Sequence, residues 1–215
     1  MSLEELDEHE RSERVREWVR KNAGSILIGL AAGIGLIYGL EQWSHHRNRT
    51  AGLAGDEYRA YAEAVEKKDA VAVATLGKTL RDKYPASPYA TLAALNDAAT
   101  ATAEGKHDEA LASLAWAEAN VTMPELKELA MLRRARLLLA TGKFDQALAL
   151  ATQIGADGYK ALAAEVRGDA LLALQRQAEA VSAYDEALVG LDAASPRRQM
   201  VEMKRDDLAA TKAGS

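Results

Sequence analysis

Two patterns of apolar residues divide this chain. The stretch from Gly24 to Leu40 carries no charged residue and lies between Lys21 and Glu41. After about residue 44, apolar side chains recur every three or four positions, the spacing of one buried face of an α-helix. Runs of β-branched residues with a period of two are absent, so we expect an all-α protein.

The charge-free stretch is long enough to cross a bilayer. Its 17 helical residues would rise roughly 26 Å, against a hydrocarbon core about 30 Å thick. Trp18 and Trp43 flank the stretch, where aromatic rings favour the headgroup level. Five glycines would weaken this helix in water, yet glycine is common in membrane helices. We therefore predict a transmembrane helix over residues 24–43; a buried helix of a soluble protein is the alternative.

The flanking charges predict how this helix is oriented. The segment before it is long and acidic, unlike the short basic start of a cleaved signal peptide. Five basic residues precede the stretch, and only Arg47 and Arg49 closely follow it. Because basic residues favour the cytoplasmic side, we predict a cytoplasmic tail over residues 1–23. Residues 44–213 would then form a periplasmic domain of a single-pass bacterial inner-membrane protein.

Glycine spacing in the predicted anchor suggests a second role. Gly29 and Gly33 are four residues apart, as are Gly35 and Gly39, a spacing that lets membrane helices approach closely. The two pairs do not share one stripe of the helix. We expect contact with membrane lipid and predict a helix–helix contact at these four glycines.

An internal repeat organises the second part of the chain. The turn sequences GKHDEA and GKFDQA begin at Gly105 and Gly142, and each precedes a new apolar helix. Aligning on these turns gives three sets of equivalent positions offset by 37 and 33 residues: Ala98, Gly105, Ala110, Leu114 and Ala117; Ala135, Gly142, Ala147, Ala151 and Ile154; Gly168, Gln175, Ala180, Tyr184 and Ala187. This period is typical of the tetratricopeptide repeat, a helix–turn–helix unit of about 34 residues.

Stacked repeats predict an α-solenoid of about three to four helix pairs, with a weaker first unit over about residues 52–84. A non-repeating helical bundle is the alternative. A last helix, from Pro196 to about Thr211, would cap the stack. In this prediction its inward residues are Met200, Met203 and Leu208, and its water-facing residues are Arg197, Arg198, Lys204, Arg205 and Asp206.

Motifs of catalysis are missing from the sequence. It contains no glycine-rich phosphate loop, no HExxH and no nucleophile elbow, and it has no cysteine. The net charge is −5 without a basic stripe, so we expect no nucleic-acid partner. His45 and His46 could bind a metal near Glu41, but further ligands at suitable spacing are lacking. We therefore expect no enzyme activity, no cofactor and no metal.

The remaining candidate is a surface for protein partners. In tetratricopeptide arrays the first helices of the pairs line a concave face. The repeat register predicts ten partner-binding residues there: Leu92, Leu95, Leu129, Leu132, Arg136, Leu139, Leu162, Glu165, Asp169 and Leu172. Leucines with a few charges suit an extended apolar segment or a partner helix. The alternative is that several of these leucines are core residues.

Four stretches carry a resemblance to a known family. They read EWVRKNAGSILIGLAAGIGLIYGLEQW, LRRARLLLATGKFDQAL, GADGYKALAAEVRGDALLA and MVEMKRDDLA. With the acidic tail and the repeats, they make nearly the whole chain similar to the YfgM family. The resemblance implies an inner-membrane protein with a periplasmic tetratricopeptide domain, associated with the SecYEG channel and the anchored chaperone PpiD. It also implies a role near emerging secreted proteins. The alternative is a membrane-anchored scaffold or assembly factor for another cell-envelope complex.

Overall fold

The computed structural model describes the backbone of residues 3–213, with side chains over residues 16–25, 28–42, 44 and 49–208. All regular secondary structure within these residues is α-helical, which confirms the predicted class. The helices are α1 (Leu3–Glu66), α2 (Ala70–Lys83), α3 (Pro88–Ala103), α4 (His107–Asn120), α5 (Pro124–Ala140), α6 (Phe144–Thr152), α7 (Asp157–Ala173), α8 (Gln177–Gly190) and α9 (Pro196–Ala213).

The chain divides into two units, and the first, Met1–Gly52, consists of the greater part of α1. Its large apolar side chains, from Ile28 to Leu40, are more than half exposed. Among the described residues, no single helix passes the length and hydropathy criteria for crossing a membrane. The segments Arg16–Ser25 and Ile28–Gln42 satisfy them together, with a bend of 50° between them. The membrane span thus stays a prediction, and the side chain of Trp43 lies outside the described residues.

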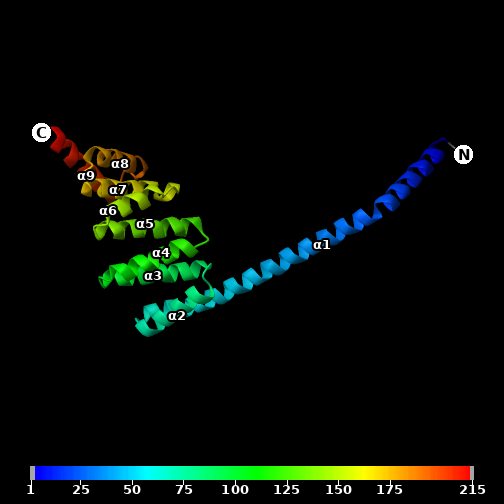
Figure 1. Ribbon diagram of the computed structural model, residues 1–215, viewed down its shortest axis with the longest axis horizontal. Helices are drawn as coiled ribbons and strands as arrows, with labels where there is room; N and C mark the ends of the chain where they lie inside the picture. The colour runs from blue at the N-terminus through cyan, green and yellow to red at the C-terminus, as the bar shows by residue number, and fades with distance from the viewer. Residues whose placement is uncertain (1–2, 214–215) are drawn as a thin grey trace. The chain divides into compact units, whose positions relative to one another are not determined.

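The second unit, Leu53–Ser215, is a stack of antiparallel helix pairs (Figure 1). The end of α1 pairs with α2, and the following pairs are α3 with α4, α5 with α6, and α7 with α8. Helix α9 packs on α8 at the end of the stack. The predicted solenoid, including its weaker first unit, is therefore present.

The turns inside the pairs share one backbone geometry. Gly105 and Gly142 have φ of 75°, and Gln175 and Lys68 occupy the same left-handed region at 61° and 57°. In each turn the residue after the left-handed one donates its backbone N–H to the carbonyl five residues earlier. Lys106 N, for example, donates to Ala101 O at 2.8 Å. This is the Schellman arrangement that ends a helix. It repeats at Asp69, Lys143 and Arg176, so the recurring turn sequences mark recurring helix ends.

Small side chains at the repeat positions of α3, α5 and α7 let the two helices of these three pairs approach closely. Ala98, Ala135 and Gly168 are buried on the first helices, and they face Leu114, Ala151 and Tyr184 on the second helices. Dense packing without voids is the normal state of a protein core. The core is therefore a row of four neighbouring clusters along the stack.

Helix α9 corrects the predicted orientation of the capping helix. Val201 is fully buried and Leu208 packs on the last cluster, whereas Met200 and Met203 are 53% and 66% exposed. Arg197 and Lys204 turn toward α7 instead of water, because carboxylates on α7 bind them. Of the three predicted inward residues, only Leu208 faces the stack.

Candidate partner-binding surface

The predicted leucines divide into core residues and accessible residues. Leu95 and Leu132 are 3% and 1% exposed and belong to hydrophobic clusters, which agrees with the alternative that several of these leucines are core residues. They fill the space between neighbouring helix pairs. Apolar spacing of three to four residues does not by itself tell such a buried position from one on an accessible face. Leu92, Leu129, Leu139 and Leu162 are half-buried, and Leu172 is exposed.

The two predicted acids are occupied within the molecule. Glu165 is 6% exposed and accepts a hydrogen bond from Arg197 Nη1 at 2.7 Å. Asp169, one turn further along α7, accepts bonds from Lys204 Nζ at 2.7 and 2.9 Å. Lys204 Nζ also lies 3.7 Å from Glu165 Oε1. Both cations come from α9, so α9 already contacts this part of α7.

A buried tyrosine on α8 forms a hydrogen bond with Asp169. The Tyr184 hydroxyl on α8 donates to Asp169 Oδ1 at 2.8 Å. The ring lies so close to α7 that a Cβ on Gly168 would be 2.6 Å from Tyr184 Cδ1. Burial, followed by the bond to Asp169, raises the pKa of the Tyr184 hydroxyl well above its ordinary value. The hydroxyl therefore remains a proton donor to Asp169 at physiological pH.

Arg136 on α5 lies close to this cluster without joining it. Its Nη2 atom is buried and has no hydrogen-bond partner among the described residues. Burial and then the charge of Arg197 lower the pKa of Arg136, while Glu165 and Asp169 act in the opposite direction. Three cations, Arg136, Arg197 and Lys204, thus lie near two carboxylates, Glu165 and Asp169, so positive charges outnumber negative ones here.

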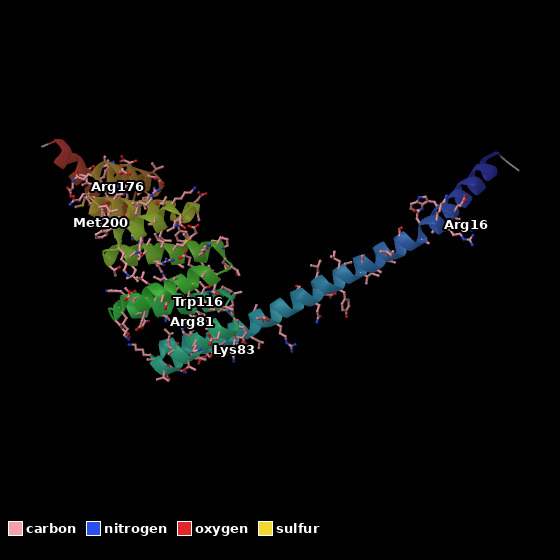
Figure 2. All side chains as sticks on the ribbon, in the orientation of Figure 1. Arg16, Arg81, Lys83, Trp116, Arg176 and Met200 are labelled. Carbon is pink, nitrogen blue, oxygen red and sulfur yellow. The ribbon has the colours of Figure 1, made fainter. Side chains whose placement is uncertain are left out.

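A hollow that sequence reasoning missed lies over α3 between α2 and α4. Its volume is about 670 Å³, and its lining includes Val73, Ala74, Asn96, Thr100, Ala101 and Ser113. Arg81, labelled in Figure 2, bonds Asp97 at its edge. One repeat later, Leu111 and Leu138 occupy the places of Ala74 and Ala101. The smaller side chains give this hollow its space, a difference that an alignment of the repeats could have revealed.

Metal ligands do not gather within the described residues. No group of three or more His, Asp or Glu side chains there could hold a metal ion. The side chains of His45 and His46, the candidate pair from the sequence, lie outside the described residues.

The stacked helix pairs define a helical-repeat protein, and comparison with known families agrees. A model described as "Tetratricopeptide repeat-like domain" matches residues 16–210, so the chain belongs to this class. No solved structure matches.

Within the class, the chain belongs to the family of ancillary SecYEG translocon subunits, which confirms the resemblance to the YfgM family. The protein of that name from Escherichia coli is 28% identical over 94% of this chain and 97% of its own length. The protein of that name from Haemophilus influenzae is 22% identical over 94% of this chain and 98% of its own length. The protein of that name from Neisseria gonorrhoeae is 33% identical over 76% of this chain and 80% of its own length. These names denote an accessory subunit and no class of enzyme.

Proposed function

We propose that this protein is a non-enzymatic accessory subunit of the SecYEG translocon, anchored in the bacterial inner membrane by residues 24–43. Residues 1–23 lie in the cytoplasm and residues 44–213 in the periplasm. The repeat array binds a PpiD-like periplasmic chaperone, emerging secreted proteins or both. The observation that carries this proposal is the near full-length match to two relatives named for that role.

The exposed apolar side chains of α1 support the membrane part of the proposal. Large apolar residues from Ile28 to Leu40 have no protein neighbours to cover them in the described structure. A Cβ on Gly29, Gly33, Gly35 or Gly39 would meet nothing within 4 Å. Hydrocarbon would cover the apolar side chains, and the glycines would allow a neighbouring membrane helix to approach.

Accessible side chains on the predicted concave face support the proposal that the array binds a protein partner. Leu172 is exposed and Leu139 is half-buried on adjacent first helices of the array. Ala99, at the position equivalent to Arg136 one repeat earlier, is exposed as well. This face combines apolar and small side chains, which suits an extended segment or a helix of another protein.

Co-purification tests the assignment to the translocon. The tagged protein, extracted in mild detergent after chemical crosslinking, is expected to carry the channel subunits with it. Recovery of another envelope complex in place of the channel, or recovery of neither, would contradict the proposal.

Site-specific photocrosslinking tests which surface is used. Probes at Leu172 and Ala99 sample the concave face, and a matched control probe at Val189 samples α8, where that side chain is 89% exposed. A probe at Gly33 samples the predicted anchor. We expect partner adducts from the concave and anchor probes and few from Val189. Equal adducts from all the array probes would count against a specific concave surface.

A further inference from the structure

Helix α9 contacts α7 through ion pairs, while Val201 and Leu208 pack into the last apolar cluster and Arg198 donates to the Leu188 and Leu191 carbonyls at the end of α8. Arg197, Val201, Lys204 and Leu208 recur at intervals of four, three and four residues and so form one stripe of the helix. Of these, Val201 is the one fully buried residue. Arg197 and Lys204 reach Glu165 and Asp169 with side chains that stay 39% and 31% exposed. A second helix with the same stripe could make the same contacts.

The receiving surface on α7 is built from parts other than α9. Tyr184, from α8, is fully buried and holds Asp169 by its hydroxyl. Glu165 is a carboxylate more than nine-tenths buried in the same helix face. A buried carboxylate requires a cation or hydrogen-bond donors, and no side-chain donor besides the two α9 cations reaches Glu165 in the described structure. The site therefore selects a positively charged ligand.

The charges around this site do not balance. Arg136 adds a third cation beside two carboxylates, and its buried Nη2 has no partner among the described residues. Its charge and that of Arg197 oppose each other. Arg136 is also attracted by Glu165 and Asp169, so it competes with the α9 cations for the same two carboxylates, which favours exchange over permanent attachment.

We propose that the inner face of α7 is a binding site for a basic amphipathic helix of a partner protein, which α9 occupies as an exchangeable internal ligand. The partner helix has a cation, an apolar residue, a cation and an apolar residue at the spacing of Arg197, Val201, Lys204 and Leu208. This inference deepens the proposed function and rests on it for the existence of a protein partner.

A labelled peptide of residues 196–213 serves as the probe. It is added to the full-length protein in nanodiscs, either unaltered or carrying Arg197→Gln and Lys204→Gln. We expect the double variant to bind the peptide at least tenfold more tightly, because its own α9 no longer competes. Adding Glu165→Gln and Asp169→Asn to that variant should abolish binding. Equal binding by the unaltered protein and the double variant would overturn the proposal.

Matched peptides separate charge from apolar contact. A peptide with glutamine in place of both Arg197 and Lys204 should not bind. A peptide with alanine in place of Met200 and Met203, the two exposed methionines of α9, should bind as well as the original. Binding that depends on the methionines and not on the two cations would overturn the proposed chemistry.

Hydrogen exchange on the unaltered protein gives an independent test that does not depend on any variant folding. We expect α9 amides to exchange at least tenfold faster than those of α7 and α8, since α9 would open on its own. Equal protection in all three helices would make α9 a fixed part of the fold and would overturn the proposal. Dimers that require Arg197 and Lys204 would assign the site to a second copy of the chain, which also overturns it. Each of these results is independent of whether the protein co-purifies with the translocon.

Discussion

At the residue scale, glycine and tyrosine exchange places between the first and last helix pairs. In the first pair Tyr61 lies on α1 and faces Gly77 on α2, where a Cβ would be 3.2 Å from the ring. In the last pair Gly168 lies on α7 and faces Tyr184 on α8. Each pair has one large and one absent side chain at the crossing. The sum of the two volumes is therefore conserved while the order is reversed.

Replacing Gly168 with alanine should destabilise the array. The added methyl group would overlap the Tyr184 ring, and overpacking a dense core costs about 1–3 kcal/mol. The free energy of unfolding in urea measures the effect. Gly158→Ala, on the same helix with nothing within 4 Å, is the control and should leave stability unchanged or slightly raised. Equal effects from the two substitutions would refute the tight crossing.

Replacing Gln175 with glycine should stabilise the array by up to about 1 kcal/mol, because a left-handed backbone is unfavourable for a residue with a Cβ. Gln175 has φ of 61°, and the equivalent residues Gly105 and Gly142 show which residue this turn favours. The reciprocal change, Gly142→Gln, should cost about the same amount. Thermal unfolding of both variants checks the prediction, and a lower melting temperature for Gln175→Gly would contradict it.

At the element scale, ion pairs join successive helix pairs with their signs exchanged. Arg81 on α2 bonds Asp97 on α3, and one repeat later Glu118 on α4 bonds Arg134 on α5. The next equivalent of Glu118 is Gly155, which has no side chain. Arg167, the equivalent of Arg134, bonds Glu186 on α8 instead. Each junction in the stack therefore has its own charge pattern.

Exchanging the two charges of the ion pair between α4 and α5 should restore much of the stability that each single substitution removes. Glu118→Arg and Arg134→Glu alone each place like charges together in a partly buried position, which we expect to cost about 1–2 kcal/mol. The double variant should recover at least half of the summed loss. A double-mutant cycle in urea measures the coupling, and simple additivity would show that the two side chains do not interact.

At the scale of the whole molecule, sequence periodicity predicted the helix pairs and their turns better than it predicted which faces are covered. Gly105 and Gly142 marked two helix ends because a left-handed residue is needed there. Leu132 and Arg136 fall on one stripe of α5, yet the first is core and the second half-buried. In α9, Met200 and Val201 are neighbours in sequence, yet Val201 is buried in the last cluster and Met200 is 53% exposed. Which side chain of a helix is buried depends on contacts between segments that are distant in the sequence.

The proposed topology can be tested throughout the chain because the sequence contains no cysteine. Single cysteines are introduced at Ser12, before the predicted anchor, and at Ser182, an exposed position on α8. A membrane-impermeant maleimide added to spheroplasts should label Ser182→Cys at once and Ser12→Cys only after permeabilisation. The opposite pattern would reverse the predicted orientation, and labelling of both from outside would exclude a single span.

The reversed order of glycine and tyrosine has a consequence for how the chain assembles. If α7 of one molecule took the place of α1 beside α2, two glycines would meet and leave a void. The reciprocal exchange would force two tyrosine rings into the space of one. Single helices from opposite ends of the array are thus poor partners for each other, which disfavours the exchange of one terminal helix between newly made chains, a form of the misassembly that repeat proteins risk.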